Sequence, residues 1–67
     1  MTLTVNGCPR VVPQGTTVAE LLIELQLDPK MIVVEHNLTI LREREQFRTH
    51  TLGDGDTLEL VHFVGGG

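Results

Sequence analysis

The segment TVAELLIELQL, residues 17–27, decides the fold because it is the clearest helix signal in the chain. Thr17 and Glu20 form a capping box, in which each side chain satisfies a backbone N–H at the other position. The apolar residues that recur at helical spacing are Val18, Leu21, Leu22 and Leu25. The pattern predicts one amphipathic helix with a single apolar face, ending at Asp28-Pro29.

Two strands joined by a tight turn are expected before this helix. The segment TLTV, residues 2–5, alternates polar and apolar side chains, as a half-buried strand does. Asn6-Gly7 follows, and this pair is the strongest short signal for a hairpin, because both central positions of a type I′ turn need a positive φ. The returning strand, residues 10–12, has a proline on each side, and proline lacks the N–H that a central strand donates. We therefore expect it at an edge of the sheet.

Further strands are expected after the helix. Residues 31–35, MIVVE, form a short β-branched run that suits a central strand, and residues 38–41, LTIL, suit a brief one. Residues 42–47, REREQF, are charged with alternating sign and predict an irregular or one-turn helical crossing. The order strand, strand, helix, strand, crossing, strand predicts an α+β fold in which one helix covers one face of a small mixed sheet.

The segment LGDGDTLELVHFV contains the last expected strand. Its GDGD is a turn, since glycine supplies positive φ and aspartate bonds nearby backbone. Beyond the turn, Leu58 and Leu60 point to one face of the strand, and Val61 and Phe63 point to the other. Because the helix covers only one face of the sheet, we expect Val61, Phe63 and Val33 to form an apolar patch on the uncovered face.

Length and charge limit the classes of function. The chain has 67 residues, enough for one small domain with a thin core. Nine acidic against five basic residues give a net charge of −4, which argues against a nucleic-acid partner. No apolar run approaches the roughly 20 residues that span a bilayer, and the first residues do not resemble a signal peptide. Cys8 is the only cysteine, so no internal disulfide is expected. A single cysteine also suits a reducing, cytoplasmic setting, which we expect for this protein.

The sequence lacks the usual signs of an active site or a metal site. The turn before the helix, PQGT, has one glycine, whereas a phosphate-binding loop needs several. His36, His50 and His62 lie far apart without a ligand pair at helical or turn spacing, so we expect surface or strand residues and no bound metal. Glu43 and Glu45 are closely spaced but have no apolar pocket beside them, and we interpret them as part of a solvated face. We therefore expect a protein that is acted upon rather than an enzyme.

The sequence given ends in HFVGGG, residues 62–67, and two interpretations of this tail are open. It is a loose end or a remnant of cloning, since glycine-rich ends are flexible and widely tolerated. Alternatively, the carboxylate of Gly67 is the reacting group, which a partner enzyme converts with ATP to an acyl-adenylate that a nucleophile attacks. Glycine suits this second role, because a tail without Cβ atoms can thread into a narrow active site.

The whole chain resembles the ThiS family, the small β-grasp, ubiquitin-like sulfur carriers of thiamine biosynthesis. The resemblance lies in VNG of the hairpin, TTVAELL at the helix start, VVEHN, the region of Arg42, LGDGDTLELVHFV and the terminal glycines. The DGD turn followed by an apolar strand ending in Gly-Gly is its most specific element. The resemblance implies a β-grasp domain over residues 1–64 and a flexible tail over residues 65–67.

The resemblance also implies a reaction sequence. Gly67 is adenylated by a ubiquitin-activating-type enzyme, ThiF, and is converted to a thiocarboxylate with sulfur from a donor such as a cysteine desulfurase. The thiocarboxylate then gives its sulfur to thiazole synthase, ThiG. ATP is used by the partner, and the carrier itself binds no cofactor. The residues implied in contact with the partners, with the glycines as a threading tail, are Val61, Phe63, Val64, Gly65 and Gly66.

Related functions stay open at this point. The small subunit of molybdopterin synthase, MoaD, shares the fold and the Gly-Gly end, although its chains are usually longer, and other carriers serve cysteine, methionine or tRNA thiolation. A further alternative is a ubiquitin-like domain that binds partners non-covalently through its sheet. The short length and HFVGGG favour the thiamine pathway. We expect the free protein to be a monomer in the cytoplasm.

Overall fold

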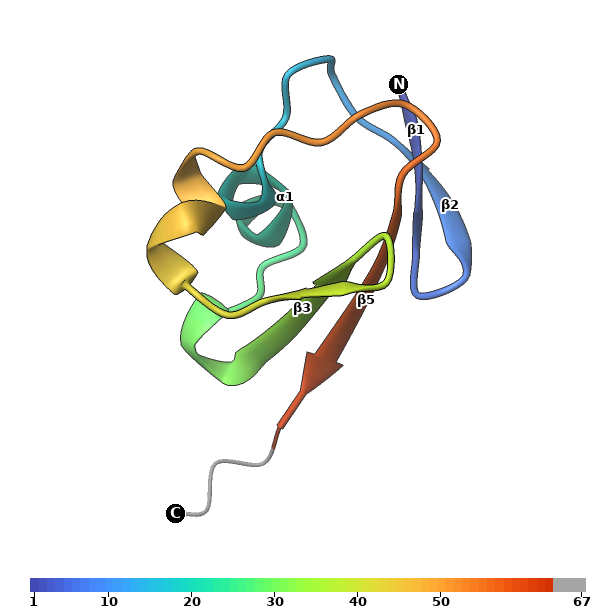
Figure 1. The fold of residues 1–67 in the computed structure, drawn as a ribbon. Helices are drawn as coiled ribbons and strands as arrows, with labels where there is room; N and C mark the ends of the chain where they lie inside the picture. The colour runs from blue at the N-terminus through green and yellow to red at the C-terminus, as the bar shows by residue number, and fades with distance from the viewer. Residues whose placement is uncertain (64–67) are drawn as a thin grey trace.

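The computed structural model describes residues 1–63 and shows a mixed sheet with helices on one of its faces (Figure 1). Among its elements, η marks a 3-10 helix. The elements in chain order are β1 (Thr2–Val5), β2 (Cys8–Val11), α1 (Val18–Glu24), η1 (Pro29–Met31), β3 (Ile32–His36), β4 (Thr39–Leu41), η2 (Arg44–Arg48) and β5 (Thr57–His62). The expected α+β layout, with one main helix against a small mixed sheet, is confirmed.

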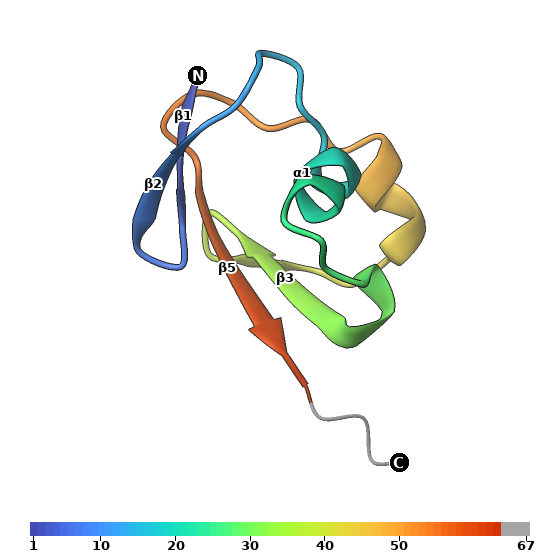
Figure 2. The ribbon, with the colours of Figure 1, turned by 180° about the vertical axis from the view of Figure 1, so that it is seen from behind.

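The last strand of the chain lies at the centre of the sheet. The five strands are ordered β2-β1-β5-β3-β4. β5 pairs with β1 in parallel and with β3 antiparallel, and Figure 2 shows it between these two neighbours. β2 and β4 form the two edges, so the prediction that the second strand lies at an edge is confirmed.

The first hairpin follows the turn chemistry of Asn6-Gly7. These residues have φ angles of 49° and 80°, as a type I′ turn requires. β2 begins at Cys8, directly after the turn, and therefore includes Pro9, which lies opposite Thr4. An edge strand tolerates this proline, since its other side has no neighbour that needs an N–H. The expected strand, residues 10–12, thus starts earlier and ends one residue sooner.

The capping box of α1 is confirmed, but the helix ends earlier than expected. The N–H of Thr17 donates to Oε1 of Glu20 at 2.9 Å, and the N–H of Glu20 donates to Oγ1 of Thr17 at 3.2 Å. The last helical residue is Glu24, and Gln26 adopts a φ of 59°. Leu27 N–H then donates to the carbonyl of Leu22, which is the closing bond of a Schellman motif. The sequence signal for the end of the helix is weak, because Gln26 occupies the position with positive φ where glycine is usual.

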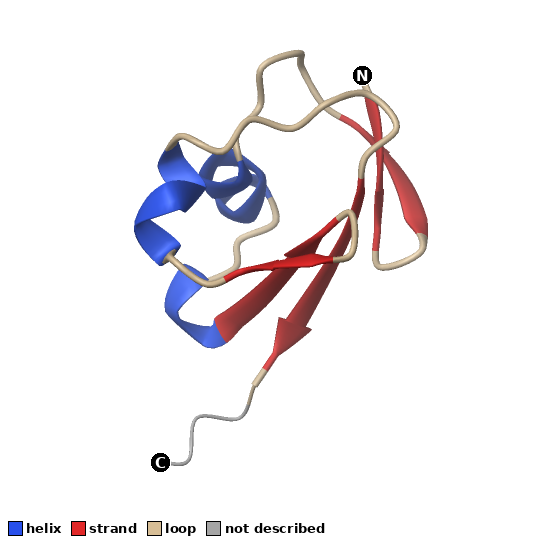
Figure 3. Cartoon of the chain, viewed as in Figure 1, coloured by secondary structure: helices blue, strands red, loops and turns tan. Residues whose placement is uncertain are grey.

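The core fills the space between the sheet and the helical layer (Figure 3). Residues of β1, β3 and β5 alternate between this core and the outer face of the sheet. α1 and η2 supply the opposing side chains, with Phe47 of η2 only 2% exposed. The buried hydrophobic residues are Leu3, Val5, Val12, Val18, Leu21, Leu22, Ile32, Val34, Phe47, Leu52, Leu58 and Leu60. The opposite face of the sheet has no helix over it in the described part of the chain.

Candidate functional site

β5 keeps its pairing with β3 up to the last described residue. Ile32 pairs with His62, and the N–H of Phe63 donates to the carbonyl of Met31 at 3.2 Å. β3 therefore fixes the direction in which the chain leaves the sheet. The residues expected to form or flank the reacting tail lie outside the described residues: Val64, Gly65, Gly66 and Gly67. Their roles, and the division of the chain into residues 1–64 and 65–67, stay predictions.

Asn6 holds the other side of β5 where β1 has ended. The pairing of β1 with β5 reaches only to Val5 opposite Leu58. The side-chain amide of Asn6 then takes the place of a further strand residue against Leu60. Its Nδ2 donates to the Leu60 carbonyl at 3.1 Å, and its Oδ1 accepts from the Leu60 N–H at 2.6 Å. The pairing with β1 alone would end at Leu58. With Asn6, β5 is hydrogen-bonded on both sides as far as Leu60.

Four apolar side chains are exposed on the part of the uncovered face formed by β3, β4 and β5. Val33 is 38% exposed and Val61 is 55% exposed, and these two residues lie directly opposite each other on β3 and β5. Phe63, 38% exposed, extends the group toward the tail, and Ile40, 45% exposed, extends it onto β4. We call these four residues the outer patch.

The alternation in the last strand predicts the position of Val61 and Phe63, and the structure places both on this face together with Val33. Ile40 was missed, because a three-residue strand is too short to show from its pattern which face a side chain occupies. Whether the outer patch binds a partner is not decided by exposure, and that role stays a prediction.

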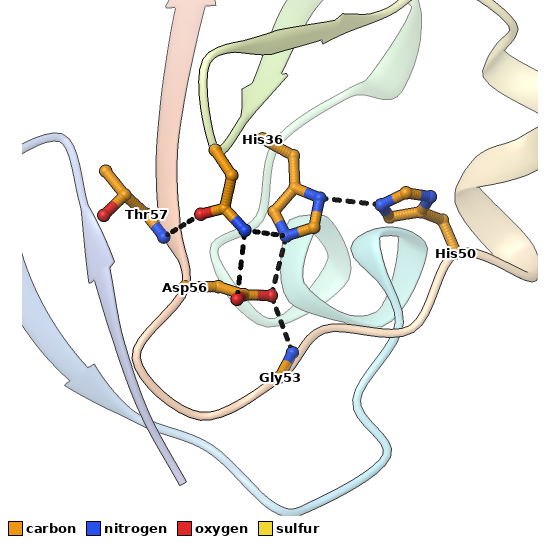
Figure 4. Close-up of polar contacts among 6 residues, drawn as sticks. His36, His50, Gly53, Asp56 and Thr57 are labelled. Atoms are coloured by element: carbon orange, nitrogen blue, oxygen red, sulfur yellow. Dashed lines mark hydrogen bonds and ion pairs between the residues drawn. The ribbon is translucent and has the colours of Figure 1, made fainter.

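A polar cluster lies at the opposite end of β5, where the strand begins (Figure 4). Nε2 of His36 is 2.6 Å from Oδ2 of Asp56, and Nε2 of His50 is 2.8 Å from Nδ1 of His36. Asn37 donates from Nδ2 to Oδ1 of Asp56 and accepts the N–H of Thr57.

The pKa of Asp56 lies below its ordinary value. Burial acts in the opposite direction, since it raises the pKa of a carboxyl group, but hydrogen bonds outweigh it. They come from the N–H of Gly53, at 2.7 Å from Oδ2, and from the side chains of His36 and Asn37, and the charge of a protonated His36 adds to them. The folded protein thus favours the ionised carboxylate.

The cluster joins segments that are distant in the sequence, and its place in the fold indicates a structural role. His50 also accepts the N–H of Val18 through its carbonyl at 3.0 Å, which ties the same loop to the start of α1. His36 ends β3, one residue beyond the strand expected at residues 31–35. The expectation that the histidines stand alone is wrong for His36 and His50. No local spacing could have revealed the contact, because it depends on how β3 and the loop before β5 meet.

Two absences concern residues 1–63 only. In this range no group of three or more His, Cys, Asp or Glu residues is placed to hold a metal ion. Nor does it contain a helix with the length and apolar character needed to cross a membrane. Cys8 is exposed on the edge strand β2.

Comparison with known proteins links the chain to one family. A family model described as the ThiS family matches residues 3–67. The sulfur carrier protein ThiS of Bacillus subtilis is 43% identical over 51 residues, which make up 76% of each chain. The crystal structure of the thiamine biosynthesis protein (ThiS) from Geobacter metallireducens aligns with a TM-score of 0.85 at 43% identity, and the match covers 100% of both chains. This structural match confirms the expected β-grasp fold.

Two other relatives are larger proteins. The thiazole synthases of Paramagnetospirillum magneticum and Magnetococcus marinus are 40% and 36% identical to the chain over 67 residues. The chain spans 20% of the length of each of these proteins. In both, a segment similar to the whole chain is therefore part of the same polypeptide as a much longer remainder.

Proposed function

The chain belongs to the ThiS family, and we propose that it is a sulfur carrier protein of thiamine biosynthesis that works through the carboxylate of Gly67. A carrier of this kind is a substrate of other enzymes and not a catalyst. One observation carries the proposal beyond the family match. β5, the central strand, is hydrogen-bonded to both of its neighbours and ends beside the outer patch, and only Phe63 and Val64 separate it from the glycines in the sequence.

The proposed chemistry needs an activated carboxylate. An oxygen of the Gly67 carboxylate attacks the α-phosphorus of ATP on an adenylating enzyme of the ThiF type, and pyrophosphate leaves. A sulfur nucleophile then displaces AMP from the acyl carbon. Sulfide gives the thiocarboxylate directly, whereas the persulfide of a cysteine desulfurase gives an acyl disulfide. A second thiol then attacks the S–S bond of that acyl disulfide, which releases the thiocarboxylate and leaves a disulfide on the donor. ATP is bound by the partner rather than by the carrier. Glycine at the last positions lets the backbone approach the reacting groups closely, because no Cβ stands in the way.

The thiocarboxylate is proposed to give its sulfur to thiazole synthase. The two relatives in which a similar segment and a thiazole synthase share one polypeptide support this partner. A shared chain keeps two domains at a high effective concentration, which favours domains that act on each other. A cytoplasmic location for the free, monomeric carrier is part of the proposal and agrees with an exposed, unpaired Cys8, which suits a reducing compartment.

In this proposal the outer patch is the surface that docks on the partners, with Val64, Gly65 and Gly66 entering the partner's active site. Val61 and Phe63 supply apolar area beside the tail, where loss of contact with water stabilises a complex. A sulfur carrier of another pathway, such as molybdopterin synthesis or tRNA thiolation, would use the same tail. Those carriers differ in which protein accepts the sulfur, so only a partner assay separates them.

The test is the intact mass of the chain ending at Gly67 after incubation with ATP, the adenylating enzyme and a sulfur source. We expect the mass to rise by the exchange of one oxygen for sulfur, confined to the C-terminal peptide. A matched variant with one residue appended after Gly67 has the same fold and should show no change. An unchanged mass for the unmodified chain, with an enzyme active on another ThiS protein, would refute the carboxylate mechanism.

The second candidate is a ubiquitin-like domain that binds partners only non-covalently. The exposed outer patch favours it as much as it favours the carrier. A residue appended after Gly67 separates the two: thiamine synthesis in a strain that depends on this protein should stop if the chain is a carrier, because the terminal glycine carboxylate is then lost. Growth of that strain without thiamine would support the non-covalent domain.

A further inference from the structure

Positive charge gathers on one flank of this acidic protein. Two adjoining surface hollows share Arg44, and together they are lined by four of the five Lys and Arg residues of the chain. Glu45 is the one carboxylate that lines them. The four cations, which we call the basic rim, are Lys30, Arg42, Arg44 and Arg48. Arg10, the remaining cation, lies on β2 at the far edge of the sheet.

The cations of the basic rim have no ionic partner within residues 1–63. The ion pair found there joins His36 to Asp56, and no carboxylate oxygen lies within 4.0 Å of a Lys or Arg nitrogen. Asp28 is close in sequence to Lys30, but its Oδ1 accepts the backbone N–H of Lys30. Exposed charges that have no partner within the described part of the chain are free to pair with charges of a second molecule.

Arg44 is held in place rather than free in solvent. Its Nε donates to the carbonyl of Pro29 at 2.9 Å, and its Nη2 donates to the carbonyl of Lys30 at 3.3 Å. These bonds tie η2 to η1, and Figure 3 shows the two helices along the same flank. A guanidinium has five N–H donors, so the others remain for an external carboxylate. Fixing the side chain in advance lowers the entropy that binding would cost.

The basic rim borders both the outer patch and the start of the tail. Val33 and Ile40 of the outer patch line the same hollow as Arg42 and Arg44. Phe63, the last described residue, donates its N–H to Met31, the neighbour of Lys30. The surface near Phe63 therefore combines an apolar centre with a charged margin, which is the usual composition of a protein–protein interface.

We propose that the basic rim binds an acidic surface of thiazole synthase beside the opening that receives the tail. The identity of the partner rests on the proposed function; the chemistry rests on the rim itself. A protein surface fits better than a phosphate group, because the four cations are spread over two hollows with apolar side chains between them. A phosphate site would instead bring its donors together around one point.

The experiment measures binding of the unfused chain to purified thiazole synthase from the same genome, at low and at high salt concentration. The double variant Lys30→Glu with Arg48→Glu should bind roughly tenfold more weakly at low salt, since two attractive charges become repulsive and salt screens such exposed charges. The affinity of the unchanged chain should fall with salt more steeply than that of the variant. Arg44 is left unchanged because it also supports the fold.

The matched control is Arg10→Glu, which makes the same change of charge on the other edge of the sheet. Binding within about twofold of the unchanged chain is expected for it, because the site of the charge is what matters. An equal loss for Arg10→Glu would show a general charge effect and overturn the proposal. So would unaltered binding by the double variant, or the absence of any binding by the unchanged chain. Amide spectra of all variants check that the fold is kept.

Inorganic phosphate serves as the second probe. Saturable shifts of the amide signals of Lys30 and Arg44 with phosphate, combined with no loss of thiazole synthase binding in the double variant, would assign the rim to a phosphate ligand and overturn the proposal. The mass assay for the thiocarboxylate is read separately. Thiocarboxylate formation with rim variants that bind normally rejects only the rim, whereas rim-dependent binding without thiocarboxylate rejects only the carrier mechanism.

Discussion

Replacement of Asn6 should show how much of the stability of β5 comes from one side chain. In Asn6→Ala, two hydrogen bonds to Leu60 are lost, each worth about 1 kcal/mol net. The φ of 49° adds a cost of about 1 kcal/mol for alanine, because its Cβ crowds the backbone there. We therefore expect the free energy of unfolding to fall by about 3 kcal/mol.

Asn6→Gly separates the two causes. Glycine accepts a positive φ, so this variant should lose only the hydrogen-bond part, about 2 kcal/mol. Gln26→Gly is the matched control, since Gln26 has a φ of 59° and makes no side-chain hydrogen bond in the described chain. It should gain roughly 1 kcal/mol by relief of strain alone. The same replacement is thus expected to have opposite signs at the two positions.

The assay is thermal unfolding together with amide exchange at Leu60. A domain of this size has about 3–10 kcal/mol of stability, and each kcal/mol shifts Tm by about 4–8 °C, so Asn6→Ala should lower Tm by roughly 12–24 °C. The Leu60 amide, whose acceptor is Asn6 Oδ1, should exchange faster in Asn6→Gly than the change in global stability explains. Equal stability of Asn6→Gly and the unchanged protein would refute the reasoning.

Three further predictions concern other parts of the molecule. Phe63→Ala should weaken docking on the adenylating enzyme by up to about 2 kcal/mol. The reason is that burying the exposed 38% of an aromatic side chain of roughly 200 Å² removes about 76 Å² from water, at about 25 cal/mol per Å². Titration calorimetry with that enzyme measures the Kd, and an unchanged Kd contradicts the prediction. Asp56→Asn should destabilise the protein at neutral pH and lose this effect in acid. The lowered pKa of Asp56 contributes stability that is present above the ordinary value of 3.8 and is lost as the pH falls through the lowered pKa. The free energies of unfolding of the variant and the unchanged protein, measured with denaturant, should therefore converge in acid. Leu38→Gly should raise the stability by about 1 kcal/mol, since Leu38 has a φ of 72° and is 90% exposed; a lower Tm would count against strain at this turn.

Local chemistry explains which parts of the fold can be predicted from the sequence. The capping box, the Asn6-Gly7 turn and the alternation around Leu58 each depend on residues within a few positions of one another. The early end of α1 is local too, but Gln26 takes a conformation in which glycine is the usual signal. Pro9 entered a strand because the missing neighbour of an edge strand removes the usual penalty.

The candidate site divides along the same line. The positions of Val61 and Phe63 follow from the two-residue period of a strand. The strand period does not predict the contact of His36 with His50 or that of Lys30 with Arg44. Each contact joins two segments that are distant in the sequence and that only the tertiary fold brings together. The role of the Gly67 carboxylate is predicted from chemistry and resemblance and stays a prediction, because Gly67 is outside the residues that the structure describes.

The central position of β5 has a consequence for synthesis on the ribosome. The sheet needs residues 57–62 between β1 and β3, so these two strands have no common neighbour while the earlier residues emerge. The core then lacks Leu58 and Leu60, the two buried side chains that β5 contributes to it. A nascent chain stopped before Thr57 would expose unpaired strand edges, which attract proteases and aggregation. The sheet can therefore form completely only after residues 57–62 have been synthesised, a few residues before the glycines.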